Sequence, residues 1–262
     1  MQENKLIIWK LNINYKVFWE LKKGNNNIVI LHGWWGSSDS WIRVWELLNS
    51  IGYNIIVPDL PGFWKTKLNN ALTLDDYAII VENFINELSV IWKEWIILWW
   101  HSNGWGISIK ISNRKKIKIS TLILNNSAGI RNDRKRSLKR KALNLLSKSI
   151  KKIIPKNIKL SKFRTLFYKL IGGQDYLESE KDPKLKQTYL NIIWSDLKEE
   201  IKNIKNNTLL IWWEKDSYTP YHDGMYMRQN IKKSKMIVLK DQKHWIHLQA
   251  PEKLVEAFIH NI

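Results

Sequence analysis

The sequence predicts an α/β protein: a mostly parallel, twisted sheet covered by helices on both faces, with a helical insertion. Short all-apolar runs such as 28–31 and 55–57 are typical of strands that are buried on both faces of a sheet. Segments with helical spacing follow most of these runs after short joins, which indicates parallel strands connected by helices. The alternation stops near Ser127 and resumes at Thr208. We therefore predict a core made of residues 1–128 and 206–262, and a helical insertion, called the cap below, made of residues 129–205.

The first part of the core begins with two strand-like runs, 6–9 and 15–19, which are separated by Asn12 and Asn14. We interpret the two runs as a hairpin or meander. Thr73 is a predicted helix N-cap, because acidic residues follow it in the first turn of an amphipathic segment. Up to Ser127 we also expect strands at 28–31, 55–57, 95–98 and 119–124, and helices at 40–49, 73–88 and from 107 onward.

The second part of the core contains two further predicted strands, at 208–211 and 236–239. A helix is expected near 222–230, and a closing helix at 251–260 has Pro251 at its favourable first position. We find no internal repeat. The resumed alternation indicates that the same sheet continues after the cap.

Composition limits the class of protein and its compartment. The 262 residues include no cysteine, which excludes disulfides and cysteine-ligated metals and is compatible with a reducing cytoplasm. The first residues are polar and lead straight into a strand-like pattern, so we expect neither a signal peptide nor a membrane span. The expected location is cytoplasmic.

The chain is strongly basic, with a formal net charge of +19 and a pI near 9.8. Fifteen Lys and Arg lie between 131 and 169 beside a single acid, Asp133. Such charge suggests nucleic acid or an anionic membrane as partner, but no nucleic-acid-binding motif accompanies it. Joint enrichment in Ile, Lys and Asn is what an AT-rich gene produces, and we prefer that explanation. We expect no nucleic-acid partner, leave peripheral contact with an anionic membrane open, and predict no oligomeric state.

The segment 99–106, Trp-Trp-His-Ser-Asn-Gly-Trp-Gly, is the centre of the functional interpretation. It has the layout of a strand end, a sharp turn and a helix start, with Ser102 at the bend. A serine hydroxyl needs an adjacent base and an acid that orients the base. Asp216 and His244 follow the last two predicted strands and supply these residue types in the order Ser, Asp, His.

These motifs resemble the α/β-hydrolase superfamily over nearly the whole chain. Segment 99–106 is similar to its nucleophile elbow, Gly-x-Ser-x-Gly, matching at Ser102 and Gly104 and departing at Trp100. Further resemblances are His-Gly at 32–33 to the oxyanion loop, Pro-Asp-Leu-Pro-Gly at 58–62 to the next loop motif, and 244–252 to the catalytic-histidine segment.

The resemblance implies a catalytic triad in which Ser102 is the nucleophile, His244 the general base and Asp216 the residue that orients it. It also implies an oxyanion hole made by the backbone N–H groups of Trp34 and Asn103. The insertion would form a lid over the site. The positive charge of this lid either steers anionic or lipid-like substrates or is simply a solvated face. No metal-ligand spacing and no phosphate-binding loop is present, so we predict neither metal nor cofactor.

The predicted function is hydrolysis of a carboxylic ester or related acyl compound through an acyl-enzyme intermediate. Serine at the elbow argues against the branches with an aspartate nucleophile, namely haloalkane dehalogenases and epoxide hydrolases. Esterase, lipase-like, carbon–carbon bond hydrolase and cofactor-free haloperoxidase-like activities stay open. His247 competes with His244 as base but is expected to pack beneath it, and His32 is expected to shape its loop. The alternative function is a catalytically inactive protein of this fold that binds a ligand or partner.

Tryptophan is anomalously common, with sixteen tryptophans against eleven glycines. We interpret several of them as glycines, encoded by UGA in a genome that reads this codon as glycine. Trp41 and Trp212 fit the resemblance as genuine tryptophans. Six others stand where the pattern has glycine or another small residue: Trp35, Trp64, Trp100, Trp105, Trp213 and Trp245.

Overall fold

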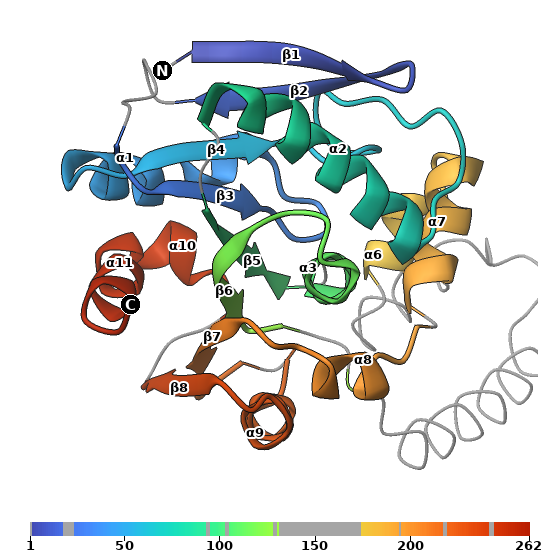
Figure 1. Ribbon diagram of the computed structural model, residues 1–262. Coiled ribbons are helices and arrows are strands. Elements are labelled where there is room, and N and C mark those ends of the chain that lie inside the picture. The colour runs from blue at the N-terminus through green and yellow to red at the C-terminus, as the bar shows by residue number, and fades with distance from the viewer. Residues whose placement is uncertain are drawn as a thin grey trace, which may run out of the picture.

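The computed structural model describes residues 2–17, 24–92, 95–102, 105–127, 130, 174–193, 195–216, 219–240 and 244–262. Its centre is one eight-stranded sheet with the strand order β1-β2-β4-β3-β5-β6-β7-β8 (Figure 1). The strands are β1 (Gln2–Ile8), β2 (Leu11–Val17), β3 (Asn27–Leu31), β4 (Asn54–Pro58), β5 (Ile96–His101), β6 (Ile119–Asn125), β7 (Asn207–Trp213) and β8 (Ser234–Leu239).

The pairing from β4 through β3, β5, β6 and β7 to β8 is parallel, and only β1 with β2 and β2 with β4 are antiparallel. All residues of β3, β4 and β5 are buried, as their apolar runs predict. The predicted mostly parallel sheet is therefore confirmed. Its parallel strands all end at one edge.

The opening hairpin differs from its prediction. Asn12 and Asn14 do not separate the two strands but lie inside β2, opposite Ile7 and Lys5. The chain turns instead at Trp9 and Lys10, whose φ angles are 46° and 69°. Two central residues with positive φ match the twist of the flanking strands and are typical of a two-residue hairpin turn. Neither Trp nor Lys is a residue type that predicts such a turn from the sequence.

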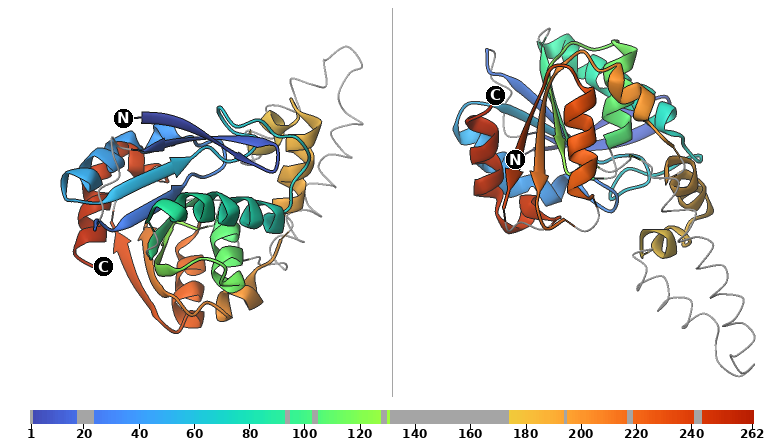
Figure 2. Two further views of the ribbon diagram at one scale, coloured as in Figure 1. Left: turned by 45° about the horizontal axis from the view of Figure 1, so that its top comes forward. Right: turned by 90° about the horizontal axis from the view of Figure 1, so that it is seen from below.

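Helices cover both faces of the sheet, as predicted (Figure 2). One face carries η1 (Ser38–Trp41), α1 (Ile42–Ser50), α10 (Ile246–Gln249) and α11 (Pro251–Ile259), and the other carries α2 (Leu74–Trp92), α3 (Trp105–Arg114), α8 (Lys198–Lys202) and α9 (Tyr221–Asn230). Consecutive residues of β5 point to opposite faces of the sheet. Trp99 packs in the core beneath α1 and α11, and Trp100 packs in the core beneath α2 and α3.

The start of α2 confirms its predicted cap. The Thr73 hydroxyl accepts a hydrogen bond from the Asp76 N–H at 3.2 Å, and the Asp76 carboxylate accepts one from the Thr73 N–H at 2.8 Å. This reciprocal pair satisfies two donors that would otherwise be left over at the helix end.

The predicted cap contributes three described helices: α6 (Gln174–Ser179), α7 (Pro183–Ile193) and α8. Ile201 of α8 and Ile204 after it are fully buried in the core cluster beneath α2 and α3. The basic stretch 131–169 lies outside the described residues, and the cap boundaries stay a prediction. In the part of the chain that the structure describes, no helix has the length and apolarity needed to span a bilayer.

Candidate catalytic site

The site lies at the edge where the parallel strands end. Ser102 follows directly after β5, Asp216 lies three residues after β7, and His244 lies five residues after β8. Ser102 has a φ of 61° and is 5% exposed. A positive φ is costly for a residue with a side chain, and it marks the sharp turn by which a strand end presents a hydroxyl.

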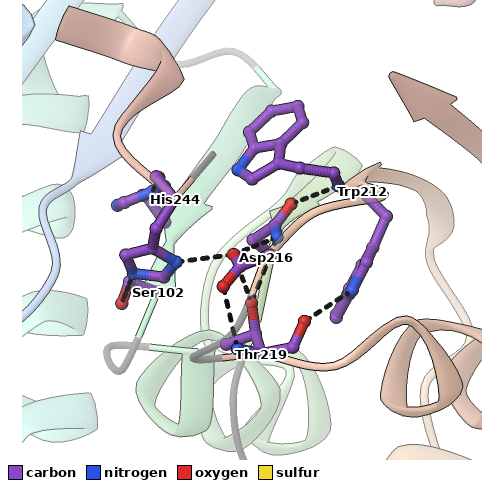
Figure 3. A network of polar contacts seen from close by, with 8 residues as sticks. Ser102, Trp212, Asp216, Thr219 and His244 are labelled. Carbon is purple, nitrogen blue, oxygen red and sulfur yellow. Dashed lines mark hydrogen bonds and ion pairs between the residues drawn. The ribbon is translucent and has the colours of Figure 1, made fainter. Parts of the chain in front are cut away.

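The structure brings these three side chains into one hydrogen-bonded chain (Figure 3). Ser102 Oγ lies 2.7 Å from His244 Nε2, and His244 Nδ1 lies 2.6 Å from Asp216 Oδ2. Nδ1 donates its proton to the carboxylate, so Nε2 of the neutral ring is the atom that accepts the Ser102 O–H. The arrangement can remove a proton from the serine hydroxyl and stabilise the resulting imidazolium.

Asp216 receives several further hydrogen bonds. The Thr219 N–H donates to Oδ1 at 3.1 Å, and the Thr219 hydroxyl donates to Oδ2 at 2.7 Å. The Asn126 amide also donates to Oδ2. Burial raises the pKa of Asp216, but the hydrogen bonds and charge of His244 and the bonds from Thr219 outweigh burial and lower this pKa. The carboxyl group is therefore ionised where it faces His244.

The loop after β3 lies against the serine. A Cβ built on Gly33 would stand 2.9 Å from Ser102 Cβ, so only glycine allows this approach. His32 Nε2 accepts the Leu60 N–H at 3.0 Å, which places the ring proton on Nδ1, 2.8 Å from the Gly33 carbonyl. His32 thus shapes the loop. Trp34 follows Gly33 in it, whereas Asn103, the second expected backbone donor, lies outside the described residues.

Two further histidines pack behind His244. The His101 ring Nε2–H donates to the main-chain carbonyl of His244 at 3.0 Å. His247 lies with its ring centroid 4.5 Å from that of His101 and stacks on Trp41, so it packs beneath the site, as expected of the second histidine in this segment. Burial lowers the pKa of both rings.

Three residues that contact Asp216 or His244 were not identified from the sequence: His101, Asn126 and Thr219. His101 stands beside the serine and Asn126 follows β6, so position alone offered a signal for both. Thr219 had none, because its role depends on how the chain turns after Asp216.

A small apolar cavity adjoins the loop after β3. It has a volume of about 10 Å³, close to what one water molecule needs. Its lining comes from this loop, from the loop after β4, from α2 and α3, and from α7: His32, Gly33, Trp34, Leu60, Phe63, Leu74, Tyr77, Ile107 and Ile192. Among the described residues, no group of three or more His, Cys, Asp or Glu is placed to hold a metal ion.

Comparisons with known proteins give consistent likenesses. Residues 26–143 match a family model described as alpha/beta hydrolase fold. The 2-hydroxy-6-oxononadienedioate/2-hydroxy-6-oxononatrienedioate hydrolase of Escherichia coli (strain K12) is 22% identical over 264 residues, covering 90% of this chain and 88% of that protein.

Solved structures are similar over almost the full length. A thermophilic esterase from Thermogutta terrifontis has a TM-score of 0.71 at 18% identity, covering 99% of this chain and 97% of that one. A putative lipase from Acinetobacter baumannii has a TM-score of 0.74 at 19% identity, covering 99% and 90%. These likenesses establish that the chain has the fold of these hydrolases.

Proposed function

We propose that this chain, a hydrolase of the α/β-hydrolase superfamily, is a serine hydrolase that cleaves a carboxylic ester or related acyl compound through an acyl-enzyme intermediate. The observation that carries the proposal is the unbroken hydrogen-bonded chain from Ser102 Oγ through His244 to Asp216. A nucleophile, a base and an acid in this order are what acyl transfer requires.

The geometry supports a two-step reaction. Ser102 Oγ attacks the carbonyl carbon while His244 Nε2 takes the hydroxyl proton, and the imidazolium then gives that proton to the leaving alcohol oxygen. A water molecule, deprotonated by the same nitrogen, attacks the acyl-enzyme and releases the acid and free Ser102. Asp216 keeps Nδ1 protonated and stabilises the imidazolium at both stages.

Stabilisation of the carbonyl oxygen is assigned to the backbone N–H groups of Trp34 and Asn103. Support comes from Gly33, which holds the loop carrying Trp34 against Ser102. Each such donor typically contributes roughly 10²- to 10³-fold in rate.

The substrate is proposed at the level of class. The neighbours are named an esterase and a putative lipase, and the E. coli relative is named for an oxo-dienedioate. Both an ester and such an oxo acid present a carbonyl carbon to a serine. Through the basic cap, an anionic or lipid-like substrate and peripheral contact with an anionic membrane stay open. The lack of cysteine is compatible with a cytoplasmic location.

We also propose that several tryptophans are glycines in the natural protein. Trp35 and Trp64 have φ angles of 60° and 48°, in the left-handed region that favours glycine. In contrast, Trp212 donates its indole N–H to the Thr219 carbonyl at 3.0 Å, and Trp41 is fully buried against His247, as expected of genuine tryptophans.

The other four positions gain no support from the backbone. Trp100 and Trp213 are fully buried, Trp245 has a φ of −100°, and the side chain of Trp105 lies outside the described residues. For these positions the proposal rests on the family pattern.

Labelling with a fluorophosphonate probe tests the function. The probe should label this chain, or the variant with the six tryptophans changed to glycine, and Ser102→Ala should abolish labelling in either background. If neither background is labelled, or if the alanine variant labels equally, the chain is the catalytically inactive binding protein. A panel of neutral esters, anionic esters and the oxo-dienedioate then identifies the substrate class.

A further inference from the structure

We infer that Asn126 is a positioning residue that holds Asp216 in the orientation needed by His244. The inference rests on the proposed function, because it assigns a role within that triad. The Asn126 side-chain amide makes hydrogen bonds both to the end of β7 and to the turn that carries the acid.

Both ends of the Asn126 amide have partners. Its Oδ1 accepts the Trp213 backbone N–H at 2.9 Å, and its Nδ2 donates to Asp216 Oδ2 and to Thr219 Oγ1, the latter at 3.1 Å. An acceptor on one end and a donor on the other leave only one orientation of the amide. The side chain therefore bridges the last residue of β7 and the turn that carries Asp216.

The bridge acts on the catalytically relevant oxygen. Asp216 Oδ2 is the oxygen that accepts from His244 Nδ1, and Asn126 donates to this same atom. Thr219 extends the network, since its hydroxyl accepts from Asn126 and donates to Oδ2. Without the amide, Oδ2 loses one donor, and the carboxylate can rotate away from His244.

The backbone explains why asparagine suits this position. Asn126 follows the last residue of β6, is fully buried and has a φ of 38°. Asparagine and aspartate tolerate positive φ better than other residues with a side chain. The backbone N–H of Asn126 donates to the Ile211 carbonyl at 3.0 Å, which fixes the backbone of Asn126 relative to β7.

Asn126→Asp is the sharpest variant, because aspartate keeps the shape and the acceptor and removes only the donor. Two adjacent buried carboxyl groups share a proton at low pH and repel each other once both are ionised. We expect kcat/KM at pH 8.5 to fall about 10- to 100-fold, the effect of losing a hydrogen bond to a charged group. The ratio of variant to wild-type kcat/KM should rise as the pH falls to 6, because the introduced carboxyl group is then protonated and donates to Asp216 again.

Asn126→Gly is the second variant, since glycine tolerates the positive φ and removes both amide contacts. We expect a loss of similar size whose ratio to wild type does not change with pH. Asn54→Asp is the matched control: Asn54 is also buried and donates its Nδ2 to a buried oxygen, Asn27 Oδ1, at 2.8 Å, at the opposite ends of the strands. It should alter stability without a pH-dependent ratio.

A proton NMR spectrum separates this inference from the proposed function. The His244 Nδ1–H bonded to Asp216 should give a downfield resonance in wild type and in Asn54→Asp, and the resonance should move upfield or disappear in Asn126→Gly. An unchanged resonance with unchanged kcat/KM in both Asn126 variants would overturn the inference. If wild type is not labelled at Ser102 but the resonance still depends on Asn126, the proposed function fails and the positioning role stands.

Discussion

The ring of His247 stacks on the indole of Trp41, with the ring centroids 4.7 Å apart and the planes at 13°. His101 lies 4.5 Å from His247, centroid to centroid, and both are almost completely buried. Burial lowers the pKa of both and of His32, in the case of His247 to about 3. Three histidines are thus held neutral around the candidate catalytic site.

This burial predicts a loss of stability in acid. The unfolded chain binds a proton at each histidine near the ordinary pKa of 6.5, whereas folded His247 does so only near 3. The contribution of His247 is therefore fully present above pH 6.5 and is lost as the pH falls toward 3. Well below pH 6.5 the free energy of unfolding should fall by about 1.4 kcal/mol per pH unit for this group.

His247→Phe isolates the effect, because phenylalanine can stack on Trp41 and does not titrate. In urea unfolding at pH 7.5, 5.5 and 4.5, the variant should gain stability relative to wild type by that amount per pH unit below 6. His260→Asn, at the exposed end of α11, should run parallel to wild type. Parallel curves for His247→Phe as well would contradict the neutral, buried histidine.

The position of Asp175 predicts an electrostatic effect of the cap on His244, the proposed base. It lies in the first turn of α6, where burial raises its pKa to about 6, Glu178 adds to the rise, and the charge of His244 opposes it. Above pH 6 its negative charge favours the His244 imidazolium that the proposed reaction forms. Asp175→Asn should therefore lower kcat/KM for a neutral ester by roughly two- to fivefold at pH 8 and have little effect at pH 5.

The control for Asp175 is Asp196→Asn, which removes the same charge from an exposed position of the loop before α8. It should leave the profile unchanged between pH 5 and 8. An Asp175→Asn profile that follows wild type throughout would mean that the cap carboxylate does not act on His244.

The sequence predicted correctly those structural features that have a local sequence pattern. All-apolar runs and helical spacing predicted the parallel strands and most helices, and strand ends located Ser102, Asp216 and His244 at one edge of the sheet. It failed at the hairpin, where Trp9 and Lys10 adopt positive φ without a turn signature.

The surroundings of the triad could not be predicted in the same way. Asn126 and Thr219 act through hydrogen bonds between residues about 90 positions apart or across a turn of unknown shape. Such contacts depend on side-chain directions that neither periodicity nor composition carries. The strand end of β6 is visible in sequence, but which of its polar residues faces Asp216 is not.

The small cavity beside Gly33 predicts a preference for short acyl groups. Its volume of about 10 Å³ is close to what one water molecule needs, and its walls are almost wholly apolar. We expect kcat/KM for p-nitrophenyl acetate to exceed that for the octanoate by at least about tenfold, because overpacking each added methylene costs binding energy. Leu74→Ala enlarges the cavity and should reduce this ratio, whereas Ile7→Ala, at an exposed strand position, should not. An unchanged ratio in Leu74→Ala would show that acyl chains bind elsewhere.

If Trp64 is a glycine in the natural protein and Trp41 is a genuine tryptophan, substitution by glycine should change stability in opposite directions at the two positions. Trp64 is 64% exposed with a φ of 48°, so Trp64→Gly removes strain of about 1 to 2 kcal/mol, partly offset by the greater freedom of unfolded glycine. Its free energy of unfolding should equal or exceed that of wild type. Trp41→Gly empties a buried site and should cost about 3 to 5 kcal/mol.

Trp100→Gly decides between the two interpretations of the elbow, because Trp100 is as buried as Trp41 but stands where a small residue is expected. If the natural residue is glycine, the variant should be more stable than wild type and react faster with the fluorophosphonate probe, since strand and helix can then approach at Ser102. A loss as large as that of Trp41→Gly would mark the indole as native. The codons give the same answer directly: UGG at positions 64, 100, 105 and 213 would refute the reassignment.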